Sequence, residues 1–127
     1  MIGGRVLDAA ALIAIASRTS VYAQALVWTA VEEGLVLVVP SSAVAGAWSR
    51  LTERDHPVID VLLGLPVTVV DDLDATRARA VGGMGLDPLD AHALLCASDR
   101  GWPLVTGDAS RYRDISSGVG IDIEPLP

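Results

Sequence analysis

The sequence predicts an α/β fold, a three-layer α/β/α sandwich with a mainly parallel sheet of five strands. Short apolar runs alternate along the chain with longer Ala- and Leu-rich segments, an order typical of parallel sheets covered by helices. The run at 35–39 is continuously apolar, as in a strand buried on both faces. With 127 residues, 51% of them hydrophobic, the chain is expected to form one packed domain over residues 1–127.

Each element is expected from a local pattern. Strands are expected at residues 5–7, 35–39, 67–70, 103–105 and 121–124. The last strand alternates in polarity and ends at Pro125, which is typical of an edge strand. Helices are expected at residues 9–16, 20–33, 42–51, 57–63, 71–81 and 88–100, with a short helical piece around 111–113. Ser20 and Gly34 cap and stop the second helix, and the acids at 71–74 open the fifth.

Composition excludes several classes of active site. All nine basic residues are Arg, so the chain has neither the Lys of a P-loop nor that of a Schiff-base site. A net charge of −7 argues against non-specific binding of nucleic acid, but it is compatible with a nuclease whose carboxylates a metal neutralises. The single cysteine fits a reducing cytosol, and we expect neither a signal peptide nor a membrane span, because the pattern of the first and the apolar run of the second are not seen. We therefore expect a cytoplasmic protein with no membrane partner.

Three aspartates are placed alike in the predicted fold. Asp8 ends the first strand, Asp108 follows the fourth, and Asp90 lies in the first turn of the helix that Asp87 caps. If the first and fourth strands are neighbours, the three carboxylates converge at the carboxyl edge of the sheet, where ligands bind in open α/β folds. Such a cluster needs a cation, and oxygen ligands select Mg²⁺ or Mn²⁺, which activate water for attack on a phosphodiester. The alternative is that each acid only caps a helix or forms a turn.

Three short segments carry a resemblance to PIN-domain proteins, close to the VapC toxins of bacterial toxin–antitoxin modules. They are Val6–Leu12, Asp90–Leu95 and Leu104–Asp108, and their order and spacing match over essentially the whole chain. The resemblance implies a Mg²⁺-dependent ribonuclease that acts on RNA, forms a homodimer and is inhibited by a small antitoxin. It also implies that Asp8, Asp90 and Asp108 are the catalytic and metal-binding acids.

One position departs from the family's pattern. The family has a Glu on its third helix, and Gly46 stands at that place. Asp87, one turn before Asp90, is the candidate for an additional metal contact, although the same residue fits a helix N-cap. The alternative function is therefore a catalytically degenerate PIN-fold binding protein. A third interpretation is an unrelated α/β domain whose acids are caps.

The other chemically active residues have simpler interpretations. His92 is expected to be a structural histidine, and Cys96 a small core residue. Trp28 and Trp48 suit core or dimer contacts. The arginines that could contact RNA phosphate are Arg18, Arg50, Arg54, Arg111 and Arg113.

Overall fold

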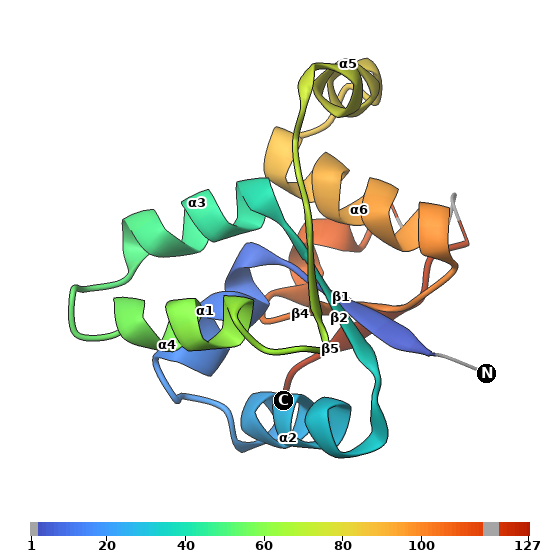
Figure 1. Ribbon diagram of the computed structural model, residues 1–127. Helices are drawn as coiled ribbons and strands as arrows, with labels where there is room; N and C mark the ends of the chain where they lie inside the picture. The colour runs from blue at the N-terminus through green and yellow to red at the C-terminus, as the bar shows by residue number, and fades with distance from the viewer. Residues whose placement is uncertain (1–2, 116–119) are drawn as a thin grey trace.

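The computed structural model describes residues 3–115 and 120–127 (Figure 1). The strands within these residues are β1 (Gly4–Leu7), β2 (Val36–Pro40), β3 (Thr68–Asp71), β4 (Leu104–Thr106) and β5 (Ile123–Pro125). They form one sheet in the order β3-β2-β1-β4-β5, and every neighbouring pair is parallel. The predicted α/β fold with a five-stranded parallel sheet is confirmed.

The helices follow the strands in the expected order. They are α1 (Ala9–Ala16), α2 (Val21–Glu33), α3 (Ser41–Arg50), α4 (His56–Leu63), α5 (Ala75–Gly83) and α6 (Pro88–Arg100), with a 3₁₀ helix η1 (Ala109–Tyr112). Ser20 accepts the backbone N–H of Ala23 at 3.1 Å, and Gly34 ends α2 in the left-handed region at φ 73°. In the described chain no single helix is long and apolar enough to cross a membrane; α1 and α2 meet those criteria only as a pair bent by 95°.

Several predicted boundaries are wrong: the last strand begins at Ile123 and not at residue 121, and two other differences have a clear physical reason. Asp71 does not open a helix; it is the last residue of β3, paired with Pro40, and Asp74 caps α5 by accepting the N–H of Arg77. The reason is that the Asp71 carboxylate has long-range partners, described below, in place of a helix N-terminus. Pro125 lies inside β5 and does not end it, which an edge strand tolerates because one side of its backbone needs no sheet partner.

Alternation of side chains along the strands builds two cores, one on each face of the sheet. Leu7, Leu37 and Val105 point to one face, where residues of α1, α2, α3 and α4 bury them. Val6, Val38 and Leu104 point to the other face and pack against α6 and η1. Figure 1 shows this layering, with α6 above the sheet, α2 below it, and α5 outermost on the α6 side.

The strand order places a crevice at the centre of the sheet. The chain proceeds from β1 outward to β2 and β3, and then β4 and β5 are added on the other side of β1. The connections after β1 and after β4 therefore leave the sheet in opposite directions. In open α/β folds this switch point, at the carboxyl ends of the strands, is the place where ligands bind. Because β1 pairs directly with β4, the condition for convergence of the three aspartates is met.

Candidate functional site

The three predicted acids line one small pocket at this switch point. Asp8 follows β1 directly and caps α1, Asp90 lies in the first turn of α6, and Asp108 follows β4. The pocket has a volume of about 60 Å³. Its other side chains of interest are those of Arg50, Leu89, Arg111 and Tyr112. The structure thus brings together the residues that the sequence singled out, and adds an arginine and a tyrosine from η1.

Asp8 is the most enclosed of the three carboxylates. One of its oxygens accepts the backbone N–H of Ala11 at 2.8 Å, and the other accepts the hydroxyl of Tyr112 at 2.8 Å. Burial raises the pKa of Asp8, and the hydrogen bonds that it accepts from Thr106, Ala11 and Tyr112 offset this effect only in part. A positive charge in the pocket would therefore stabilise the ionised form of Asp8.

Asp90 already has a positive partner. The Nε of Arg111 donates to its Oδ1 at 2.9 Å, and an Nη lies 3.4 Å from its Oδ2, so the guanidinium covers both oxygens. The hydrogen bond to Asp90 raises the pKa of Arg111. The Arg111 guanidinium also lies 4.0 Å from Asp87. The pair is half-buried, a setting in which a fork of charge-assisted hydrogen bonds is stronger than at an open surface.

Asp87 and Asp108 differ from the two enclosed acids. Asp87 accepts the backbone N–H of Leu89 at 3.0 Å as the N-cap of α6, and it does not line the pocket. Asp108 is exposed and accepts the hydroxyl of Ser110, while its own N–H donates to Thr106 at 3.0 Å. Thr106 therefore fixes the turn that presents Asp108 to the pocket.

The donor chemistry of the pocket fits a hard divalent cation. Three carboxylates line it, and carboxylate oxygens are what Mg²⁺ and Mn²⁺ prefer. Their ligand atoms are more widely spaced than those of a preformed three-ligand site, because in the described chain only Asp71, His92 and Cys96 have ligand atoms within 4.8 Å of one another. Asp8, Asp90 and Asp108 would hold the cation, which would compete with Arg111 for Asp90.

The cluster of Asp71, His92 and Cys96 joins β3 to α6 and was not foreseen from the sequence. His92 is fully buried; its Nε2 lies 2.9 Å from Asp71, and its Nδ1 lies 2.7 Å from the Ser42 hydroxyl on α3. A signal existed in the spacing, since residues 92 and 96 lie four apart on one helix face. Ser42 and Asp71 are distant from His92 in the sequence, so no local pattern indicated that they would be its partners.

Charge argues against a metal at this second cluster. Arg77 from α5 donates to both oxygens of Asp71, at 3.2 and 3.0 Å, and contacts the Cys96 sulfur at 3.7 Å. Burial opposes ionisation of Asp71, but the hydrogen bond from His92 and the charge of Arg77 outweigh it and lower the Asp71 pKa. Burial raises the pKa of Cys96 to about 12, so the sulfur is a thiol and not the thiolate that metals bind. The cluster is an internal ion-pair network that ties α5 and α6 to β3, in keeping with the structural role expected for His92.

Any side chain at position 46 would have to displace Leu89. A Cβ built on Gly46 would lie 2.6 Å from the Leu89 Cδ2 and 3.4 Å from the Ala9 Cβ. The side chain of Leu89 thus fills the space beside the pocket toward which a residue on this turn of α3 would project. A side chain at position 46 would therefore require the end of the Leu89 side chain to shift.

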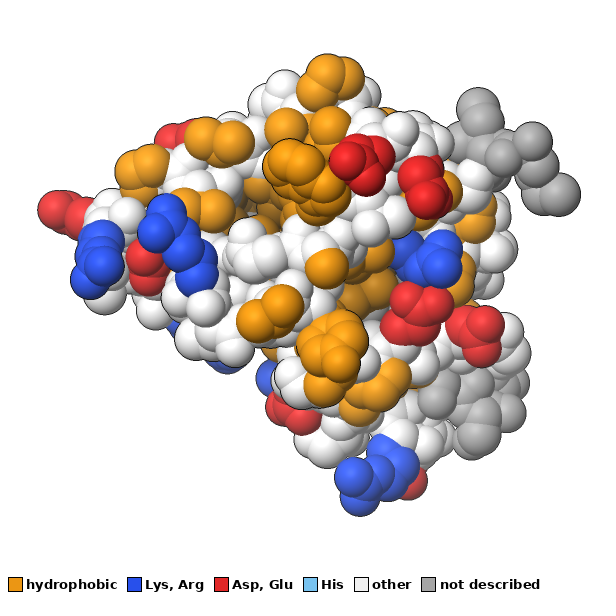
Figure 2. All heavy atoms as spheres, turned by 90° about the horizontal axis from the view of Figure 1, so that it is seen from below, with side chains coloured by type: hydrophobic (Ala, Val, Ile, Leu, Met, Phe, Trp, Pro, Cys, Tyr) orange, Lys and Arg blue, Asp and Glu red, His pale blue; other side chains and the backbone are white. Residues whose placement is uncertain are grey.

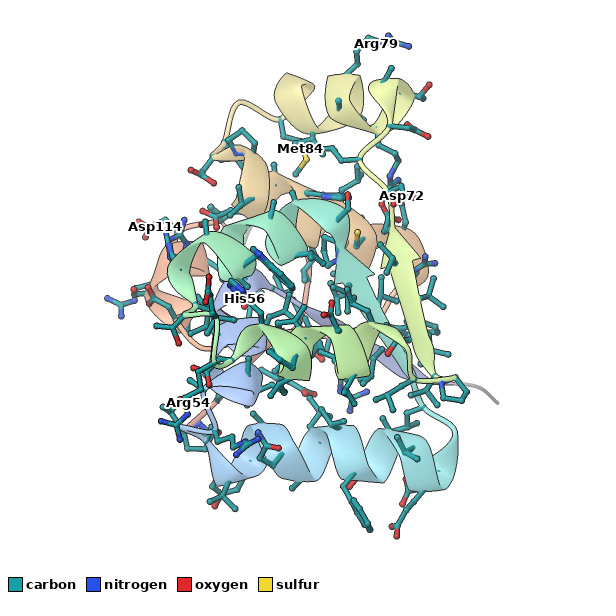
Figure 3. All side chains as sticks on the ribbon, turned by 60° about the vertical axis from the view of Figure 1, so that its left-hand side comes forward. Arg54, His56, Asp72, Arg79, Met84 and Asp114 are labelled. Carbon is teal, nitrogen blue, oxygen red and sulfur yellow. The ribbon has the colours of Figure 1, made fainter. Side chains whose placement is uncertain are left out.

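Trp28 and Trp48 are not core residues. Trp28 is 67% exposed on α2 and Trp48 is 37% exposed on α3, so the core interpretation is wrong and the dimer interpretation remains a prediction. His56 is the first residue of α4. It lies beside the end of α3 (Figure 3) and stacks on Trp48, with the ring centroids 3.9 Å apart and the planes 10° from parallel.

Fold and pocket define the class of the protein as a parallel α/β domain with a carboxylate site at the switch point of its sheet. No family model matches the sequence, and no curated protein matches it either. Among solved structures, the chain is similar to one in the crystal structure of VapBC2 from Rickettsia felis bound to a DNA fragment from the VapBC2 promoter. The match covers 100% of both chains with a TM-score of 0.65 and 13% sequence identity. At this identity the similarity shows the fold, which is PIN-like and close to that of VapC toxins.

Proposed function

We propose that this chain is a metal-dependent endoribonuclease and the toxin component of a toxin–antitoxin pair. The observation that carries the proposal is the placement of Asp8, Asp90 and Asp108 around one pocket at the switch point of a VapC-like fold. Carboxylates that only cap helices need not share a pocket. Their presence in one pocket beside two arginines is what a site for a cation and a phosphate requires.

Each residue of the pocket has a separate task in this proposal. Asp8, Asp90 and Asp108 would hold Mg²⁺ or Mn²⁺, which, when bound, supplies Lewis-acid activation for hydrolysis of a phosphodiester. The Tyr112 hydroxyl fixes the orientation of the Asp8 carboxylate. Arg50, an exposed residue that lines the pocket from α3, offers a charge for the RNA phosphate.

The proposed antitoxin has a suitable surface away from the acid pocket, between α2 and α4. A groove of about 350 Å³ lies between α2 and α4, and its lining includes Trp28, Val31, Val61 and Leu65. Figure 2 looks onto the α2 side and shows hydrophobic side chains gathered across its middle. Such a groove fits the apolar face of an amphipathic helix from a partner protein. Homodimerisation, which the same family resemblance implies, is the other use of an exposed apolar surface.

The second candidate is a PIN-fold binding protein without catalysis. Two observations favour it. Leu89 fills the space beside Gly46 that a fourth acid would need, and Arg111 neutralises Asp90 without any metal. In that case the pocket would be a relic whose Asp90 is paired with Arg111, and the groove between α2 and α4 would be the functional part of the molecule.

Cleavage of a mixed pool of structured RNA at graded Mg²⁺ and Mn²⁺ decides between the two. We expect metal-dependent cleavage by the wild type, and its loss in Asp8→Asn and Asp90→Asn. The matched control is Asp72→Asn, an exposed aspartate after β3 that lies outside the pocket (Figure 3) and should leave cleavage unchanged. A wild type as inert as the two pocket variants at every metal concentration would favour the binding protein.

A further inference from the structure

The acid pocket contains a cation that belongs to the protein. Arg111 extends from η1 into the pocket and places its guanidinium on both oxygens of Asp90. Three carboxylates and two guanidinium groups, those of Arg50 and Arg111, line the pocket. The formal charges balance when a divalent ion takes the place of one guanidinium, whereas a divalent ion added beside both would leave an excess of positive charge.

Arg111 is also placed so that it can leave Asp90. Its side chain is 34% exposed and belongs to a short 3₁₀ helix rather than to a helix packed along its length. The carboxylate of Asp87 lies 4.0 Å from the same guanidinium and is 54% exposed, so a second acceptor is available at the rim. The movement from one carboxylate to the other needs a change of side-chain rotamer and leaves the positive charge paired.

We propose that Arg111 and a divalent cation are alternative partners of Asp90, and that Arg111 thereby sets the affinity of the pocket for metal. The inference rests on the proposed metal site, and it assigns to Arg111 a role that the three acids alone do not reveal. Arg111 is a positioning residue in this scheme: in the absence of metal it holds Asp90 in place, and it gives way when metal binds.

The test is a calorimetric titration of Mn²⁺ into the wild type and into Arg111→Gln, with RNA absent. Because the cation no longer has to displace a guanidinium, we expect the variant to bind Mn²⁺ about tenfold more tightly, a difference of about 1.4 kcal/mol. Arg113→Gln removes an equal charge from an exposed residue at the C-cap of η1 and is the matched control. Its Mn²⁺ affinity should stay within about twofold of the wild type, because an exposed charge is screened by salt.

Two further measurements keep the test decisive. Arg111→Lys retains the charge but lacks the planar guanidinium that donates to both oxygens of Asp90, so its Mn²⁺ affinity should lie between those of the wild type and Arg111→Gln. Thermal unfolding in a chelator should show Arg111→Gln to be less stable than the wild type, and saturating Mn²⁺ should stabilise it by more degrees than it stabilises the wild type.

Unchanged or weaker Mn²⁺ binding by a folded Arg111→Gln would overturn the inference while leaving the metal site intact. An effect of Arg113→Gln equal to that of Arg111→Gln would also overturn it, because the cause would then be net charge. If neither the wild type nor Arg111→Gln binds Mn²⁺, the proposed metal-dependent function fails together with the inference. Mn²⁺ binding that Asp8→Asn abolishes and Arg111→Gln strengthens supports both.

Discussion

Whether Gly46→Ala stabilises or destabilises the protein should depend on the side chain of Leu89, which lies next to Gly46. In an open helix, replacing Gly by Ala stabilises a protein by about 1 kcal/mol. Here the new Cβ would lie 2.6 Å from the Leu89 Cδ2, and such overpacking typically costs about 1 to 3 kcal/mol. We therefore expect Gly46→Ala to leave the free energy of unfolding unchanged, or to lower it by up to about 2 kcal/mol.

The same substitution should be stabilising once Leu89 is shortened. In a Leu89→Ala background the obstructing atom is gone, and Gly46→Ala should raise the free energy of unfolding by about 1 kcal/mol. Urea denaturation of the four proteins, followed by circular dichroism, gives the coupling between the two sites, which we expect to be about 1 to 3 kcal/mol. An effect of Gly46→Ala that is equal in both backgrounds would refute the proposed steric reason for glycine at this position.

This contact also decides how a fourth acid could be restored. Gly46→Glu alone has to displace Leu89 before its carboxylate can approach the pocket. The double variant with Leu89→Ala removes that obstacle, so only the pair should strengthen Mn²⁺ binding relative to its Leu89→Ala parent. Equal Mn²⁺ affinities in the single and double variants would show that Leu89 does not guard the site.

Three other predictions follow from buried groups. Burial raises the pKa of Asp8 above the ordinary 3.8, so the Asp8 carboxyl binds a proton more readily in the folded state than in the unfolded state. The free energy of unfolding of the wild type therefore falls as the pH rises through the window between the unfolded-state pKa and the raised folded-state pKa. Asp8→Asn, which keeps an oxygen to cap α1, should therefore unfold at a higher temperature than the wild type at neutral pH, with no difference below the window; a lower melting temperature at neutral pH would contradict this. His92→Ala should lower the free energy of unfolding by about 2 to 4 kcal/mol, because it opens a cavity and leaves the Ser42 hydroxyl without its partner. The control Arg79→Ala, on the outer side of α5 (Figure 3), should change the free energy of unfolding little. Cys96, buried and with a pKa of about 12, should react with a thiol reagent at neutral pH only after unfolding.

Local signals were sufficient to predict the order and most boundaries of the elements. Ser20 and Gly34 delimit α2 as expected, and Asp87, Pro88 and Gly101 delimit α6, because caps and stops act within a few residues of the chain. The placement of acids after β1 and β4 was also readable, since parallel strands end at one edge of the sheet. Asp71 was misplaced because its role depends on a partner 21 residues away.

The contents of the pocket depend on contacts of the same long-range kind. Arg111 lies 21 residues from Asp90, and Tyr112 lies 104 residues from Asp8. Nothing in the local pattern at 109–112 distinguishes an arginine that reaches the acids from one that points into solvent. The sequence therefore indicated that Asp8, Asp90 and Asp108 lie at one edge of the sheet, but not that the protein supplies Asp90 with a counter-ion.

The two acidic clusters show why accessibility is a better guide to function here than ligand spacing. Asp71, His92 and Cys96 lie closer together than the pocket acids, yet Arg77 and Arg100 already pair with Asp71, and His92 is fully buried. Its charges are balanced within the fold, and a ligand could gain little by entering. The Asp8–Asp90 pair lies at the switch point and opens to a pocket, and its arginine is a third exposed and faces a second acceptor. An arginine that holds three elements together has to stay in place, whereas one at the mouth of a pocket can be exchanged for a metal ion.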